Sequence, residues 1–243
     1  MKEGIYLIFA IVPAVLWIYY FYTHDKGERD PLILLILAAM VGAAVVIPTA
    51  LSEIFITKNI LPLFIPQSKI APITAHSQFT IFLIFNLALI AIIEEVFKFL
   101  AVRLTVYNSR HFSEIADGIV YMVAAALGFA AFENFLYFLN FGQKIIVARS
   151  IFTPLFHASA SAIVGHYLAL AKWDKSYSKK VYVALILAIL LHFVYNFLVF
   201  SASFYGNYLY TILAIILLAI SGRWMLQKFK ETEDLDEEEK INL

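Results

Sequence analysis

Residues 118–140 read GIVYMVAAALGFAAFENFLYFLN, an apolar run that also carries Glu133 and Asn134. The hydrocarbon core of a bilayer is about 30 Å thick, so a helix needs about 20 apolar residues to cross it. The same length of apolar sequence recurs along the chain. We predict an all-α fold, a polytopic membrane bundle of about seven transmembrane helices. They cover Gly4–Tyr22, Pro31–Leu51, Phe79–Leu104, Gly118–Asn140, Ile145–Ala171, Val181–Ser201 and Tyr208–Gln227.

The composition agrees with a membrane protein. Of 243 residues, 62% are hydrophobic and 15% are charged, and the charges gather in short clusters between the apolar runs. This distribution is typical of membrane proteins and not of soluble domains. Residues 1–227 should form a single transmembrane catalytic domain. Residues 228–243 are strongly acidic, which predicts a solvated and disordered cytoplasmic tail.

Two features of the whole chain narrow its chemistry and its placement. There is no cysteine, which excludes disulfides, thiolate metal ligands and a cysteine nucleophile. Of the 18 Lys and Arg residues, twelve fall on one predicted side of the membrane, five fall on the other, and Lys98 lies inside it. The positive-inside rule then predicts a multi-pass protein of the cell membrane with its N-terminus outside and its C-terminus cytoplasmic.

The segment Ser52–Gln78 differs from the other connections. It is long, it contains Pro62, Pro66 and Pro72, and it alternates apolar with polar residues. This pattern suits a piece of chain that lies at the outer membrane interface or re-enters the membrane. It is either an ordinary connector or a gate for a substrate.

Ionisable residues lie where lipid is expected. A charge near the bilayer centre costs about 3 kcal/mol or more, so each such residue needs a partner or a function. At 1.5 Å of rise per residue, Glu95 lies about 14 Å from the predicted cytoplasmic ends of the helices, His192 about 17 Å, His157 about 21 Å and Glu133 about 23 Å. These residues form one layer. Asp117 and His166 fall near the cytoplasmic ends and are left out of the site.

Helical geometry suggests how this layer is organised. His192 and Asn196 are four residues apart and share a helix face. Glu94 and Glu95 are adjacent, about 100° apart around the helix, and must have different roles. Lys98 is within reach of either one. If Lys98 pairs with one glutamate, the other stays free as a base.

These side chains could hydrolyse a peptide bond. The reaction needs a water, a base that activates it and a partner for the oxyanion. Glu94 or Glu95 would be the base, and a histidine and the Asn196 amide could face the oxyanion. Alternatively, Glu133, His157 and His192 could hold Zn²⁺ with a water in the fourth position. The residues by themselves leave both mechanisms open.

Two other classes of function use similar residues. Carboxylates and histidines on neighbouring helices also form proton relays, as in a proton-coupled transporter. No internal repeat or paired broken helix supports that reading. Bis-histidine haem binding by His157 and His192 would not explain the paired glutamates.

Ordered motifs run along the chain: Glu94-Glu95-Val96-Phe97-Lys98, Asp117-Gly118-Ile119-Val120-Tyr121, Gly128-Phe129-Ala130 with Glu133-Asn134, His157-Ala158, and His192 with Asn196. They resemble the PrsW family of intramembrane proteases, which belongs to a wider superfamily with the CAAX prenyl endopeptidases and bacteriocin-processing enzymes. The resemblance also includes the loop Asp25–Pro31 and covers most of the chain from there to the sixth predicted helix.

The resemblance implies an endopeptidase that cuts membrane-anchored regulatory proteins, such as anti-sigma factors, within the bilayer. It implies no nucleic-acid partner, and the oligomeric state stays open. Its functional residues fall on Glu94, Glu95, His157, His192 and Asn196. The wider pattern has Phe-x-x-x-His where this chain has Phe129-x-x-x-Glu133. That departure leaves open the role of Glu133, and with it the choice between a zinc mechanism and one that uses glutamate alone.

Overall fold

The computed structural model describes residues 2–26, 30–60 and 81–241, and within these ranges the chain is helical and contains no strand. A π-helical turn, Ile56–Ile60, extends α3, and short 3-10 turns lie at Gly142–Ile145 and Lys175–Tyr177. The long helices are α1 (Lys2–His24), α2 (Leu32–Ala44), α3 (Val46–Phe55), α5 (Ile81–Leu104), α6 (Ile115–Phe141), α7 (Ile146–Trp173), α8 (Ser178–Tyr205) and α9 (Tyr208–Ile241).

The predicted polytopic bundle is confirmed. Among the described residues, six helical segments are long and apolar enough to cross a membrane, and α2 and α3 together form one of them. Helix α5 is comparably long, with 24 residues, but its apolar sequence is interrupted by Glu94, Glu95, Lys98 and Arg103. The chain is therefore a multi-pass membrane protein.

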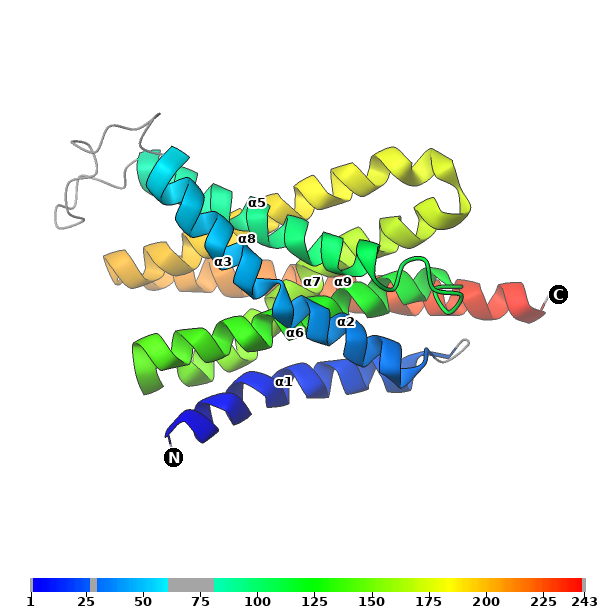
Figure 1. Ribbon diagram of the computed structural model, residues 1–243, viewed down its shortest axis with the longest axis horizontal. Helices are drawn as coiled ribbons and strands as arrows, with labels where there is room; N and C mark the ends of the chain where they lie inside the picture. The colour runs from blue at the N-terminus through cyan, green and yellow to red at the C-terminus, as the bar shows by residue number, and fades with distance from the viewer. Residues whose placement is uncertain (1, 27–29, 61–80, 242–243) are drawn as a thin grey trace.

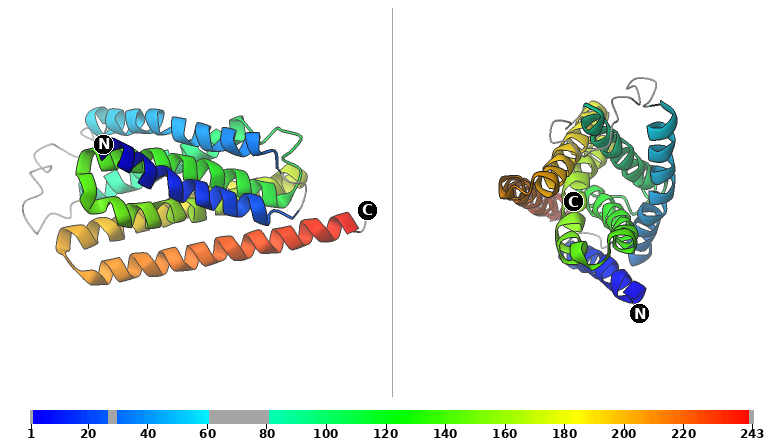
Figure 2. Two further views of the ribbon diagram at one scale, coloured as in Figure 1. Left: turned by 90° about the horizontal axis from the view of Figure 1, so that it is seen from below. Right: turned by 90° about the vertical axis from the view of Figure 1, so that its left-hand side faces the viewer.

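Helices α6 and α7 form the centre of the bundle (Figures 1 and 2). Helix α6 packs against α1, α2 and α7. Helix α7 also packs against α8 and α9, while α5 packs mainly against α8 and also contacts α6 and α3. From Ala116 to Ala130, α6 is buried at every position. A helix that is apolar all round is stable only when neighbours cover it on all sides, which explains its central place.

Glycines let the central helices approach one another closely. A methyl group added to Gly128 would lie 1.9 Å from the backbone oxygen of Ala39 on α2. One added to Gly165 on α7 would lie 2.2 Å from the oxygen of Gly118 on α6. The small residues on α6 and α7 therefore allow the backbone contact that membrane helices use for packing.

The expected disorder of residues 228–243 is wrong for most of that segment. Helix α9 continues to Ile241 and runs beside the bundle (Figure 2). Asp236 accepts hydrogen bonds from the backbone nitrogens of Ile115 (3.3 Å) and Ala116 (3.0 Å) at the start of α6. Glu233 accepts one from the backbone nitrogen of Lys26. These acidic residues therefore accept hydrogen bonds from the backbone of distant segments. A count of like charges in the sequence does not reveal such contacts. That residues 1–227 form a single catalytic domain stays a prediction.

The predicted interfacial segment is only partly described. Residues 52–60 continue the helical path of α3, beyond the predicted end at Leu51. Residues 61–80, including the three prolines, lie outside the described residues, and so does the suggested substrate gate.

Asp117, which was left out of the predicted site, has a structural partner. Its carboxylate accepts hydrogen bonds from the backbone nitrogens of Ser113 (2.5 Å) and Glu114 (2.7 Å). Together with Glu114 it forms a reciprocal capping box at the start of α6. It therefore fixes the helix that carries Glu133.

Candidate functional site

Helices α5, α6, α7 and α8 bring the predicted ionisable residues together in one buried cluster. Glu94 and Glu95 come from α5, Glu133 from α6, His157 from α7 and His192 from α8. The His157 and His192 rings lie 5.1 Å apart, centre to centre, and are perpendicular. Both histidines and both members of the glutamate pair are buried. Residues up to 98 positions apart in the sequence thus share one site.

Glu95 is held on several sides. It forms a fully buried ion pair with Lys98, one helical turn later. Its Oε1 atom also lies 2.7 Å from Nδ1 of His192, and Ser161 donates a 3.5 Å hydrogen bond to Oε2. A carboxylate with this many partners is fixed in place, so Lys98 pairs with Glu95 and not with Glu94.

Glu94 differs from Glu95 in having an oxygen without a hydrogen-bond partner. Its Oε2 atom is buried and has no hydrogen-bond partner within the described part of the chain. It faces Nε2 of His192 at 3.7 Å, which is too long for a direct hydrogen bond. A carboxylate can only accept, so Nδ1 of His192 donates to Glu95, and in the neutral ring Nε2 then carries a lone pair. Two electron-rich atoms therefore face each other, an arrangement that favours a proton donor or a cation between them.

His157 has a partner on each ring nitrogen. Nζ of Lys98 lies 2.9 Å from Nδ1, and Oε2 of Glu133 lies 3.2 Å from Nε2. An ammonium group can only donate and a carboxylate can only accept. Both neighbours therefore favour the same neutral tautomer, with the proton on Nε2 and the lone pair on Nδ1.

Glu133 joins the cluster to a residue that the prediction did not include. Arg149 on α7 donates from Nη2 to Oε1 of Glu133 (2.9 Å) and from Nε to Oδ1 of Asn134 (3.0 Å). The guanidinium also lies 3.6 Å from the centre of the Tyr137 ring. Both carboxylate oxygens of Glu133 are thus engaged, one with Arg149 and one with His157.

The cluster contains a donor set that suits a metal ion. Ligand atoms of Glu94, His157 and His192 all lie within 4.8 Å of one another, and all three residues are buried. One carboxylate and two imidazoles are typical ligands of catalytic zinc. The unpartnered Oε2 of Glu94 supports the fit, although Lys98 would have to leave Nδ1 of His157 if that atom were a ligand. The predicted metal set had Glu133 in place of Glu94.

Asn196 lies one turn after His192 on α8 and is half-buried. Its side-chain amide makes no hydrogen bond to the residues that the structure describes. The hydrogen-bond donors of the Asn196 amide are therefore not used by another described residue.

Arg149 and Ser161 contact the cluster but are not among the site residues that the sequence predicts. Arg149 lies inside the predicted helix Ile145–Ala171, and a charged residue within a membrane helix is the signal that could have found it. Ser161 lies among small residues, a pattern that indicates helix packing and gives no signal of a polar contact. Glu53 on α3 was also missed, and its charge acts on both Glu94 and Glu133.

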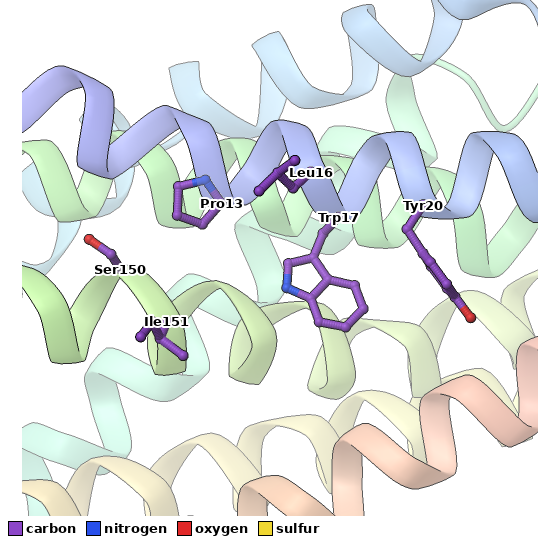
Figure 3. A pocket seen from close by; sticks show the side chains of 6 residues that line it. All are labelled: Pro13, Leu16, Trp17, Tyr20, Ser150 and Ile151. Atoms are coloured by element: carbon purple, nitrogen blue, oxygen red, sulfur yellow. The ribbon is translucent and has the colours of Figure 1, made fainter.

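A separate apolar groove of about 460 Å³ lies between α1 and α7 (Figure 3). None of the predicted site residues lines it. Its walls are formed by Pro13, Leu16, Trp17, Tyr20, Ser150 and Ile151.

Comparison with known proteins assigns the chain to a family. Residues 30–221 match the model of the PrsW family of intramembrane metalloproteases. Protease PrsW of Oceanobacillus iheyensis is 33% identical over 190 residues, which cover 78% of this chain and 80% of the relative. Protease PrsW of Geobacillus kaustophilus is 30% identical over 82% of each chain. Protease PrsW of Bacillus subtilis is 28% identical over 84% of this chain and 85% of the relative.

No solved structure matches the chain. The matched region of the family model includes every residue of the cluster. The protein is therefore a peptidase with a protein substrate in a lipid environment. This function replaces the alternatives of a proton-coupled transporter and a haem-binding protein. The chain belongs to the PrsW family of intramembrane metalloproteases.

Proposed function

We propose that this protein is an intramembrane endopeptidase that hydrolyses a peptide bond in a membrane-anchored regulatory protein, with Glu94 as the base that takes the proton of the attacking water. The observation that carries the proposal is the contrast between the two glutamates. Glu95 is bound by Lys98, His192 and Ser161, whereas Oε2 of Glu94 is buried and unpartnered among the described residues. A base must have a free lone pair directed at the water.

The other residues divide the remaining work. Glu95 holds His192 by Nδ1, so that Nε2 faces Glu94 across the space where the water would bind. The amide of Asn196, one turn further along α8, is the neutral donor for the developing oxyanion. Lys98, which contacts Glu95 and Nδ1 of the neutral His157, supplies the positive charge. The buried setting strengthens each of these electrostatic interactions, because water does not screen them.

The same donors would hold Zn²⁺. In that alternative, zinc-dependent mechanism its ligands would be His157, His192 and Glu94, because both oxygens of Glu133 are already engaged. Glu94 would then bind the metal instead of serving as the base. A Zn²⁺ ion bound there would act as a Lewis acid on the scissile carbonyl. Metal analysis of purified wild type and the Glu94→Gln, Glu133→Gln and His192→Ala variants tests this assignment. If zinc is retained in Glu94→Gln but lost in Glu133→Gln, the carboxylate ligand is Glu133 and not Glu94.

The catalytic role of Glu94 is tested with Glu94→Gln and Glu95→Gln, assayed on a membrane-anchored reporter in proteoliposomes. Glu94→Gln should fold as wild type does, since no hydrogen bond to Oε2 is lost, and its cleavage rate should fall by about 10²-fold or more. Glu95→Gln should lose stability as well as activity, because it leaves Lys98 unpaired. Cleavage by Glu94→Gln at the wild-type rate contradicts the proposal.

The orientation in the membrane belongs to the same proposal. With the N-terminus outside and the C-terminus cytoplasmic, the connection that contains Ser176 faces the cytoplasm and the one that contains Asn207 faces outward. The distribution of Lys and Arg residues supports this arrangement.

A further inference from the structure

Arg149 occupies a position that the proposed reaction does not use directly. It lies near the start of α7, its side chain is 23% exposed, and it contacts α6 and not the reacting groups. Three hydrogen bonds join it to two consecutive residues of α6. Nη2 donates to Glu133, Nε donates to Asn134, and the Asn134 amide donates to the backbone oxygen of Arg149 at 3.2 Å.

The plane of the guanidinium is fixed as well. Tyr137, one turn after Glu133 on α6, lies beneath it with the ring centre 3.6 Å from Cζ. Asn134 is completely buried, so its end of the interaction cannot move freely. An arginine that is stacked on a ring and bonded at two edges has little rotational freedom. The side chain acts as a rigid clamp on Glu133.

The clamp determines where the second oxygen of Glu133 points. With Oε1 bound to Arg149, Oε2 lies 3.2 Å from Nε2 of His157. A carboxylate that accepts from one imidazole nitrogen fixes the tautomer and orientation of the ring. The lone pair on Nδ1 of His157 then faces Lys98, which in turn binds Glu95.

We propose that Arg149 is a positioning residue for catalysis: through Glu133 it holds His157 in the tautomer protonated on Nε2 and aims Nδ1 into the site. This inference rests on the proposed function for its effect on cleavage, while the tautomer itself can be measured without activity. Arg149 does not contact the substrate in this assignment.

Substitutions of Arg149 separate this role from substrate binding. A lysine ammonium group cannot replace the guanidinium that donates from Nη2 to Glu133 and from Nε to Asn134. Arg149→Lys should therefore retain the positive charge but lose the paired hydrogen bonds to α6. Loss of a group that orients a catalytic histidine typically costs about 10- to 100-fold in activity. We expect kcat to fall by about that factor in Arg149→Lys and Arg149→Gln, with KM changed by less than about 3-fold.

The matched control is Arg103→Gln. Arg103 also stacks on a tyrosine, with Cζ 4.2 Å from the Tyr107 ring, but it makes no hydrogen bond to the cluster among the described residues. Its replacement should leave kcat within about 2-fold of wild type. An equal loss of kcat in both variants would show that any lost arginine–tyrosine stack damages the enzyme, and would overturn the assignment.

A double variant tests the route through Glu133. If both residues act on His157 in one chain, Arg149→Gln combined with Glu133→Gln should be no slower than the slower single variant. Independent roles would instead multiply the two losses. A raised KM with unchanged kcat in Arg149→Gln would assign the guanidinium to substrate binding and also overturn the proposal.

The tautomer provides a readout that does not depend on cleavage. In detergent-solubilised protein labelled with ¹⁵N-histidine, and with His157→Gln to assign the signal, wild type should show His157 protonated on Nε2. Arg149→Gln should show a mixture of tautomers or exchange between them, and Arg103→Gln should match wild type. An unchanged His157 signal in Arg149→Gln refutes the positioning role. If wild type fails to cut the reporter while the tautomer responds as expected, the proposed function fails and the positioning role stands.

Discussion

Lys98 connects the two halves of the buried cluster, since its ammonium group binds both Glu95 and Nδ1 of His157. It is completely buried and also lies 5.3 Å from the centre of the Phe129 ring. A buried charge that loses its partner is costly, because no water replaces the lost interaction. The stability of the site therefore depends on keeping the charges of Lys98 and Glu95 balanced.

Removal of Lys98 alone should unbalance the site. We expect Lys98→Met to lower the free energy of unfolding by about 3–5 kcal/mol, because Glu95 would remain buried without its cation. Thermal unfolding in detergent measures the effect. The double variant Lys98→Met with Glu95→Gln should regain most of the stability but not the activity. Equal stability of Lys98→Met and wild type would show that the ion pair does not hold the site together.

Asp30 gives the fold a pH dependence outside the membrane-spanning segments. Burial raises the pKa of Asp30 to about 7, and the charges of Asp25, Glu114 and Glu233 add to the rise, while the hydrogen bond from Tyr121 opposes it. The folded state therefore binds a proton that the unfolded state releases above about pH 4. Stability should fall as the pH rises from about 4 to 7.

The matched variant for this effect is Asp30→Asn, which keeps an acceptor for Tyr121 and cannot ionise. We expect wild type to lose stability relative to Asp30→Asn by up to about 1.4 kcal/mol per pH unit across that range. Unfolding curves of both proteins from pH 4 to 8 test this. A difference that does not change with pH would mean that Asp30 titrates alike in both states.

At the scale of the helices, backbone contact positions α6. Because Gly128 lies against the backbone of Ala39, any added side-chain atom must push α2 and α6 apart. This spacing determines how far Glu133, five residues later on α6, reaches toward α7. Helix packing and the geometry of the site are therefore linked.

Gly128→Ala tests that link. Overpacking of a tight contact costs about 1–3 kcal/mol, and here the clash is with backbone, which cannot rotate away. We expect lower thermal stability and reduced cleavage. Gly222→Ala is the control, since its added methyl would meet only Leu155, at an ordinary 3.8 Å. Unchanged stability in Gly128→Ala would show that α2 can shift freely.

At the scale of the whole molecule, the natural absence of cysteine allows the orientation to be tested directly. Ser176 and Asn207 are exposed and lie at opposite ends of α8. We expect a membrane-impermeant maleimide to label Asn207→Cys on intact cells, and to label Ser176→Cys only after the membrane is opened or inverted. The reverse pattern would invert the proposed orientation. Labelling of wild type gives the background.

Much of the molecule followed from the sequence. Apolar length predicted the helices, and their observed bounds extend the predicted ones by a few residues at most ends, because caps and turns are less marked than apolar runs. The pairing of Lys98 with one glutamate also followed from helical spacing, although spacing could not choose between Glu94 and Glu95. The predicted disorder of residues 228–243 was wrong for most of that segment. Its carboxylates accept hydrogen bonds from backbone nitrogens of distant segments, and local charge density carries no information about such contacts.

The sequence by itself determined the membrane bundle, the family and the residue types of the site, because hydrophobic length and the cost of intramembrane charge are local properties of the chain. Only the tertiary structure decided which glutamate is engaged, which nitrogen of each histidine faces which partner, and that Arg149 clamps Glu133. These are distances between different helices. They depend on how helices rotate and approach one another, which is set by side-chain packing across the whole bundle and not by the spacing of residues along any one helix.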